Sequence, residues 1–156
     1  MVRSHVIIGL AAWIGVAPVL HIRPDDLGCL ALAAAGSLLP DIDHPKSWVG
    51  RRTRPFSPAI AAAFSHRGIT HSAIAVIGLT LLLLHAGYHR AGVSALIIGY
   101  LSHLAADMLT PQGLRLAWPL RRTWGVPLCR IPEMEKLIVT LVVIAVAWSW
   151  LRHHAV

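Results

Sequence analysis

Apolar residues gather in five long runs along the chain, and short polar segments separate the runs. These runs predict helices over residues 5–22, 24–39, 70–87, 92–109 and 133–151. A helix needs about 17 to 25 mainly apolar residues to cross a bilayer, and the second run lies near the lower limit of that length. The pattern predicts an all-α fold, a multi-pass membrane helical bundle of about five helices. We expect a single membrane-embedded domain over residues 1–156.

Polar residues and prolines indicate where the helices begin and end. Pro24 suits the first position of the second helix, where Asp25 and Asp26 complement the positive end of the helix. Thr70 is a candidate N-cap for the third helix and would place His71 in its first turn. Prolines and glycines between residues 110 and 132 predict an irregular cytoplasmic loop near the C-terminal third, which can contain a small hairpin.

The composition is typical of a membrane protein. Apolar residues make up 56% of the chain, charged residues make up 13%, and the mean hydropathy is +0.63. The formal net charge of +7 would suggest nucleic-acid binding in a soluble domain. Here the basic residues lie in loops between apolar runs, so topology and anionic lipid headgroups explain them and no nucleic acid is expected as a partner. Cys29 and Cys129 provide neither a disulfide framework nor a metal-binding cysteine pair.

Lys and Arg residues are distributed unequally between the two sides of the predicted bundle. With five spans, eleven of them lie on the side of the N-terminus and three lie on the other side. Segments of inner-membrane proteins that face the cytoplasm carry an excess of Lys and Arg. The distribution predicts a multi-pass membrane protein whose N-terminus is cytoplasmic.

Histidines and carboxylates that are far apart in the sequence fall at the cytoplasmic ends of the predicted helices. They are Asp41, Asp43, His66, His71, His103 and Asp107. His103 and Asp107 are four residues apart and so share one helix face. Gly68 offers a break that lets His66 and His71 approach one point from a turn and from a helix start. Because ionisable residues in membranes are costly and mark functional sites, the set predicts one site built from several helix ends.

Carboxylates and imidazoles without thiolates suit Zn²⁺, Mn²⁺ or Fe²⁺. One zinc ion takes about four ligands, so the six residues predict one divalent ion, or two that an aspartate bridges. Asp41 or Asp43 would bridge or orient the metal, and Arg67 would bind a phosphate or stabilise its charge. Four further residues on this side are left open as ligands: His5, His44, Glu133 and Glu135.

Three motifs in this order carry a family resemblance. They are LPDIDH at 39–44, HRGITHS at 66–72 and GYLSHLAAD at 99–107, and TPQG follows at 110–113. Together they resemble the YdjM-like family of small bacterial inner-membrane proteins, which are described as membrane-bound metal-dependent hydrolases. The resemblance covers about residues 1–120 and implies a metal site of the six residues named above. Some members are similar in motif order to zinc-dependent phospholipases C and nucleases, whose N-terminal ligand draws attention to His5.

The leading hypothesis is a metal-dependent hydrolase that acts on a phosphoester, in a phospholipid or a lipid-linked phosphate reached from the bilayer. Membrane lipids are the expected partners. A metal or proton transporter is one alternative, because polar residues inside a membrane often mark pathways, but here they gather at one face. A second alternative is a non-catalytic membrane protein in which the metal only braces the helix ends.

Overall fold

The computed structural model describes residues 2–54, 56–59 and 68–154, and helices make up most of this part of the chain. The α-helices are α1 (Val2–Val16), α2 (Leu27–Gly36), α3 (Trp48–Arg52), α5 (Ala73–His85), α6 (Arg90–Met108) and α7 (Pro132–His154). Short 3-10 helices also occur: η1 (Ala17–Leu20), η2 (Leu39–Asp43) and η3 (Ile69–His71). No strand occurs among the described residues, so the all-α prediction is confirmed. Each of the five predicted ranges overlaps one of the helices α1, α2, α5, α6 and α7.

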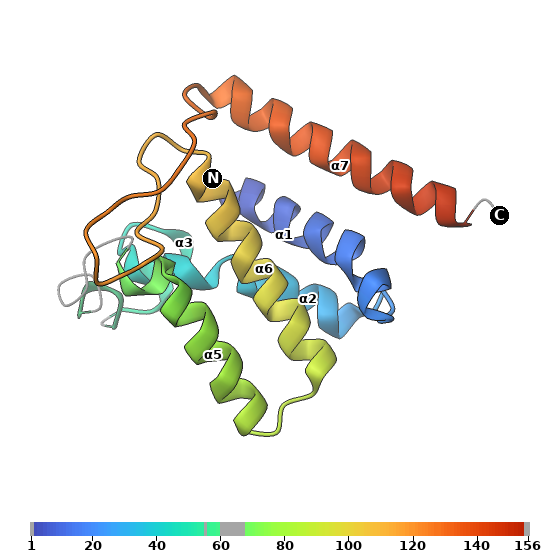
Figure 1. Ribbon diagram of the computed structural model, residues 1–156, viewed down its shortest axis with the longest axis horizontal. Coiled ribbons are helices and arrows are strands. Elements are labelled where there is room, and N and C mark those ends of the chain that lie inside the picture. The colour runs from blue at the N-terminus through green and yellow to red at the C-terminus, as the bar shows by residue number, and fades with distance from the viewer. Residues whose placement is uncertain (1, 55, 60–67, 155–156) are drawn as a thin grey trace.

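Helix α6 is the central element of the bundle (Figure 1). It packs against α1, α2 and α5, whereas α7 lies along α1 on the outer side. The start of α1, the end of α6 and the start of α7 meet around one cavity. Helix ends that are distant in the sequence therefore gather at one end of the bundle.

The contact between α2 and α6 is close because a glycine lies at the crossing on each helix. A Cβ atom at Gly99 of α6 would overlap the carbonyl oxygen of Ala33 on α2. A Cβ atom at Gly36 of α2 would overlap the carbonyl oxygen of Leu96 on α6. Small residues allow helix backbones to approach in membrane proteins, where packing takes over from the hydrophobic effect. The crossing holds the C-terminal end of α2 firmly against α6.

Three helical stretches are long and apolar enough to cross a membrane: Val2–Leu20, Arg90–Met108 and Glu133–Leu151. Helices α2 and α5 have 10 and 13 residues. At about 1.5 Å per residue, neither of them reaches across a hydrocarbon core of about 30 Å. The protein is thus a helical membrane bundle in which two of the five predicted helices are shorter than a span.

Helix α2 begins later than the sequence predicted. Asp26, and not the turn at Pro24, precedes its first residue, and the Asp26 carboxylate accepts the backbone N–H of Cys29 at 2.7 Å. This side-chain cap satisfies an amide that the helix itself leaves without a partner. The same hydrogen bond lowers the pKa of the Asp26 carboxyl group.

Helix α5 also begins later than predicted. Ser72 is its N-cap, with a hydroxyl that accepts the backbone N–H of Ala75 at 3.3 Å, so the prediction of Thr70 at this position was wrong. His71 consequently lies in the 3-10 turn before the helix and not in its first α-helical turn. Side chains in a 3-10 turn point in different directions from those in an α-helix. The side chains of Thr70 and His71 both lie at the end of the bundle where the polar helix ends gather.

The segment between α6 and α7 folds back over the end of α6. The backbone N–H of Val126 donates to the carbonyl of Met108, the last residue of α6, at 2.9 Å. Leu114 and Trp124 exchange two backbone hydrogen bonds of 2.8 and 2.7 Å. The loop is irregular, as predicted, and contains this small hairpin, which covers the helix end that carries polar residues.

Candidate metal centre

Side chains from four segments meet at one end of the bundle. They are His5 of α1, Asp41 and Asp43 of η2, His71 of η3, and His103 and Asp107 of α6. Asp41 is half-buried and the other five are buried. Burial of polar and charged groups is costly unless they find partners, so the contacts among these six side chains decide what the cluster can do.

One ring nitrogen of His103 is held by backbone. Its Nδ1 lies 2.7 Å from the carbonyl oxygen of Ser37, which follows α2. Because a carbonyl can only accept, Nδ1 carries the proton and donates it, and Nε2 of the neutral ring holds a lone pair. That Nε2 is buried and has no hydrogen-bond partner among the described residues. It lies 3.8 Å from Oδ2 of Asp107 and 4.0 Å from Oδ1 of Asp41, so a lone pair faces two carboxylates.

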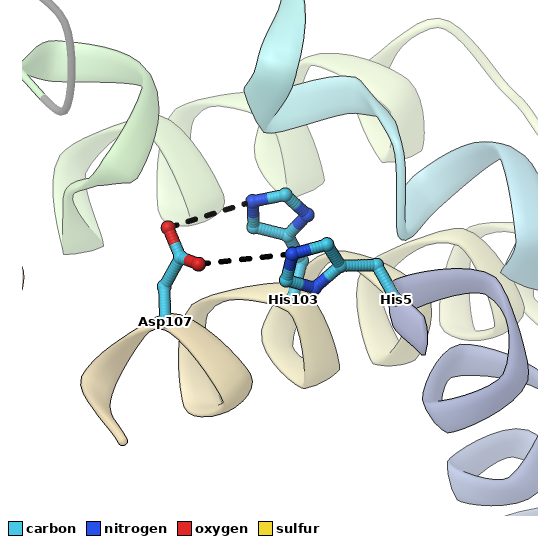
Figure 2. Close-up of side chains that lie close together, drawn as sticks. All are labelled: His5, His103 and Asp107. Atoms are coloured by element: carbon cyan, nitrogen blue, oxygen red, sulfur yellow. Dashed lines mark ion pairs between the residues drawn. The ribbon is translucent and has the colours of Figure 1, made fainter. Parts of the chain in front are cut away.

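Asp107 directs its two carboxylate oxygens toward different histidines (Figure 2). Oδ1 lies 3.7 Å from Nε2 of His5, and Oδ2 lies 3.8 Å from Nε2 of His103. Oδ2 also lies 3.6 Å from Nε2 of His71. The rings of His5 and His103 stack, with centroids 4.1 Å apart and planes inclined by 20°. All three nitrogen–oxygen distances exceed the hydrogen-bond range of about 2.7–3.2 Å, so these groups converge as ion pairs without direct hydrogen bonds between them.

Asp43 contacts the other ring nitrogen of His71. Its Oδ2 lies 3.2 Å from Nδ1 of His71, and the hydroxyl of Thr70 donates to the same oxygen. The phenol of Tyr100 on α6 donates in turn to the backbone carbonyl of Thr70. In metal sites, the ring nitrogen of a histidine that does not bind the metal (the outer nitrogen) often contacts a carboxylate. That contact sets the tautomer and the orientation of the ring. His71 is thereby oriented with Nε2 toward Asp107.

Two overlapping groups of these side chains have the spacing of cation ligands. One is His5, His103 and Asp107, the other is Asp41, His71 and His103, and the ligand atoms of each group lie within 4.8 Å of one another. Ligand atoms about 2.0–2.2 Å from a tetrahedral ion are about 3.3–3.6 Å apart. The nitrogen–oxygen separations within the groups, 3.7 to 4.0 Å, lie just above that range. Imidazole and carboxylate ligands suit Zn²⁺, Mn²⁺ or Fe²⁺, so the residues present fit a divalent cation.

Similarity to known proteins agrees with this architecture. Residues 1–156 match the model of the family described as YdjM inner membrane protein. The chain belongs to the YdjM inner membrane protein family. It is therefore a protein of the inner membrane, as its apolar helices and the sequence motifs predicted.

Individual relatives cover most of the chain. Inner membrane protein YdjM of Escherichia coli (strain K12) is 42% identical over 123 residues, which are 74% of this chain and 62% of that protein. The protein of the same name in Shigella flexneri matches to the same extent. "Uncharacterized protein YvsG" of Bacillus subtilis (strain 168) is 30% identical over 118 residues, which are 75% of this chain and 72% of that protein. The match thus spans about 62% of the length of the two YdjM proteins. No solved structure matches the chain.

Four of the six metal ligands predicted from the YdjM-family motifs come together in the two groups. They are Asp41, His71, His103 and Asp107. Asp43 belongs to neither group and lies instead against the outer nitrogen of His71. His66 and Arg67, predicted as a ligand and as a phosphate-binding residue, lie outside the described residues.

His5 is the one open candidate that joins a group. Its ring comes from the first turns of α1 and stacks on His103, a contact between residues 98 positions apart that no local pattern reveals. Nδ1 of His44 accepts the backbone N–H of Lys46 at 3.1 Å, and His44 belongs to neither group. Glu135 lines the cavity beside His5 and Asp107, and Glu133 is exposed.

Proposed function

We propose that the protein is a membrane-bound metal-dependent hydrolase that cleaves a phosphoester, in a lipid or a lipid-linked compound, at the cytoplasmic face of the inner membrane. Its cofactor is one or two divalent cations, with zinc favoured over manganese and iron. One observation carries the proposal. The buried Nε2 lone pair of His103 faces oxygens of Asp107 and Asp41 at 3.8 and 4.0 Å. A cation between these atoms relieves their repulsion away from water.

The converging side chains have distinct roles in this proposal. Five of them hold the cation: His5, Asp41, His71, His103 and Asp107. Asp43, which the sequence suggested as a ligand and a catalytic residue, is assigned to positioning His71 through the 3.2 Å contact with Nδ1. The carbonyl of Ser37 has the same effect on His103. Arg67 remains the proposed phosphate-binding residue.

The proposed reaction is hydrolysis at phosphorus. A bound divalent cation supplies Lewis acidity, which lowers the pKa of water and offsets charge on the phosphoryl oxygens. The oxygen of water forms a bond to phosphorus, and the bond between phosphorus and the ester oxygen breaks. One proton of the water goes to the leaving alcohol, and the other stays on the phosphate product or is released to the solvent. The buried side chains of the centre exclude bulk water and keep the ligand atoms in place.

The proposed orientation rests on charge. Eleven Lys and Arg residues lie on the side of the N-terminus in a five-span arrangement, and three lie opposite. The converging residues come from the starts of α1 and α5 and from the ends of α2 and α6. Helices α2 and α5 are shorter than a span, but they end and begin beside the start of α1, so these ends share the face that carries the excess of Lys and Arg.

The first test is metal content. We expect the purified protein, loaded with zinc in a mild detergent and freed of excess metal, to retain zinc in a fixed ratio to protein. His103→Ala and Asp107→Ala remove buried ligands and should lose it. His85→Ala removes an exposed histidine at the end of α5 and is the matched control, which should keep it. Metal content is measured by inductively coupled plasma mass spectrometry. Equal zinc content in all four proteins would contradict the proposal that these residues bind a metal.

The second test is turnover on the same preparations. Phosphomonoesters and phosphodiesters should be hydrolysed by the zinc-loaded protein and by His85→Ala, and not by Asp107→Ala. Zinc binding without turnover of any ester would favour the metal-braced, non-catalytic alternative. Zinc flux in liposomes would favour transport.

A further inference from the structure

Two cavities reach the candidate metal centre, and both are lined by His5, Asp107 and Gln112. One has a volume of about 580 Å³ and the other about 260 Å³. They differ in chemistry. Because they share residues of the centre, a ligand held at the centre can extend into both.

The larger cavity, here the basic cavity, is lined by Lys46 and Arg51 together with His44 and Trp48. The guanidinium of Arg52 stacks over the ring of Trp48 at 3.8 Å, which supports this wall from behind. Two cationic side chains beside a cation-binding centre attract a ligand group that carries its own negative charge, and Arg binds phosphate oxygens particularly well. The basic cavity is therefore suited to a phosphate.

The smaller cavity, here the apolar cavity, lies between α1, the end of α6 and α7. Apart from the shared residues, its walls include Ile8 of α1, Leu109, and Ile138 and Val139 of α7. Arg130 and Glu135, which carry opposite charges, also line it. Cys129 also lines it, and burial raises the pKa of that thiol, so the thiol stays neutral. An apolar wall next to a polar centre suits the part of a ligand that water does not hydrate.

A separate groove lies further along the same two helices. Ile7 and Ile14 of α1 and Val143 and Val146 of α7 line this α1–α7 groove, which has a volume of about 490 Å³ and only apolar lining residues. The two helices run side by side (Figure 1). The groove follows α7 from Val143 to Leu151, about 12 Å, and begins one helical turn beyond Val139 of the apolar cavity. A hydrocarbon chain in the apolar cavity can thus extend toward the groove along α1 and α7.

We infer that the centre takes an amphiphilic phosphate whose charged group lies toward the basic cavity and whose hydrocarbon chain lies in the apolar cavity and the α1–α7 groove. The inference deepens the proposed function and rests on it for the reacting phosphoester. Its own content is the joint recognition of charge and chain. The basic and apolar cavities share His5 and Asp107, which argues for this occupant, because a cavity filled only by bulk lipid needs no connection to a polar centre.

Binding of phosphonates tests the inference without turnover, because their carbon–phosphorus bond is not an ester. Dodecylphosphonate, methylphosphonate and dodecanol are titrated into the zinc-loaded protein in one detergent, and binding is followed by calorimetry. We expect dodecylphosphonate to bind at least tenfold more tightly than either of the others, because burial of each methylene favours binding by up to about fourfold. Equal binding of dodecanol and dodecylphosphonate would mean that the groove holds only bulk lipid chains and would overturn the inference.

Substitutions locate the two parts of the ligand. Val139→Trp fills the apolar cavity and should weaken dodecylphosphonate binding at least tenfold while methylphosphonate binding is unchanged. Ile8→Trp, from the opposite wall, should do the same and provides a second variant if the first fails to fold. Ile144→Trp is the matched control on α7, because Ile144 is exposed and lines neither cavity nor groove. Retained zinc shows that each variant is folded.

The basic cavity is tested with Arg51→Gln. Loss of a charged hydrogen-bond partner should weaken both phosphonates about tenfold or more and leave dodecanol unaffected. Arg54→Gln is the matched control in the same segment, since Arg54 lines neither cavity. Unchanged phosphonate binding by Arg51→Gln, or unchanged dodecylphosphonate binding by both tryptophan variants, would overturn the inference.

The outcomes separate the inference from the proposed function. Chain-dependent phosphonate binding without hydrolysis of any phosphoester would support the ligand class and contradict the hydrolase. Hydrolysis of phosphoesters at equal rates by Val139→Trp, Ile8→Trp and the unsubstituted protein, whatever the chain length, would support the hydrolase and contradict the ligand class.

Discussion

Helices α6 and α7 are both long and apolar enough to cross a membrane, but they have opposite surroundings. In α6, 44% of the membrane-spanning stretch is buried inside the protein, and in α7 none of it is. Helix α6 meets α2 backbone to backbone at Gly99, and it carries His103 and Asp107. Helix α7 meets α1 through side chains and leaves cavities along the contact.

The close α2–α6 contact and the looser α1–α7 contact are suited to different tasks. Ligands of a cation must stay within about 0.5 Å of their positions, which requires rigid elements and supporting hydrogen bonds. The close crossing of α2 and α6, with Ser37 and Tyr100 as hydrogen-bonding supports, meets that requirement. The proposed hydrocarbon chain needs space instead, and the cavities between α1 and α7 leave that space.

The largest effect is expected at the α2–α6 crossing. Gly99→Leu would push α6 away from Ala33, because even a Cβ atom overlaps the backbone there. We expect a loss of about 3 kcal/mol or more of stability and loss of bound zinc, measured by thermal unfolding in detergent and by metal analysis. Gly78→Leu on α5 is the control, since a Cβ atom there meets nothing within 4 Å. Unfolding of Gly99→Leu at the temperature of the unsubstituted protein would show that the crossing is not rigid.

The next effect concerns the support of the metal centre. Asp43→Asn keeps the shape of the side chain but removes the charge that faces Nδ1 of His71. Loss of such a support lowers metal affinity by about 10- to 100-fold, which competition with a coloured chelator would measure. Asp25→Asn, at an exposed carboxylate paired with Arg23, should leave zinc affinity unchanged. If both variants bind zinc like the unsubstituted protein, Asp43 does not position His71.

A smaller effect is expected from the support that α6 gives to the η3 turn. Tyr100→Phe removes the hydroxyl that donates to the carbonyl of Thr70. A hydrogen bond of this kind contributes about 0.5–1.5 kcal/mol, so the unfolding midpoint should fall slightly. Tyr88→Phe changes an exposed phenol and serves as the matched control. An equal midpoint for the two variants would mean that this hydrogen bond adds nothing to stability.

The smallest effect is expected on the side of α7. A Cβ atom at Gly15 of α1 would lie 3.8 Å from Cγ2 of Val146, which is an ordinary contact. Gly15→Ala should therefore not lower stability in the same unfolding experiment, and the higher helix propensity of alanine should raise stability by up to about 1 kcal/mol. A loss of stability instead would show that α1 and α7 pack as closely as α2 and α6, and would remove the contrast between the two regions.

The sequence by itself determined the helical class, the positions of five apolar helices and the pairing of His103 with Asp107. These features depend on local chain properties, namely the length of apolar runs and the 3.6-residue period of the helix. It also indicated that polar residues collect at one end, because alternating helices bring their ends to two faces. Helix starts were less predictable, since Asp26 and Ser72 compete with nearby residues for the capping position.

Only the tertiary structure decided how the polar residues divide their roles. Whether Asp43 contacts an ion or the outer nitrogen of His71 depends on the direction of a side chain in a turn. The lone pair on Nε2 of His103 follows from the hydrogen bond between Nδ1 and Ser37, 66 positions away. The position of His5 beside His103 follows from ring stacking between α1 and α6. The two cavities arise from the packing of four segments. Such contacts depend on distances between distant parts of the chain, which local patterns of hydrophobicity and charge do not contain.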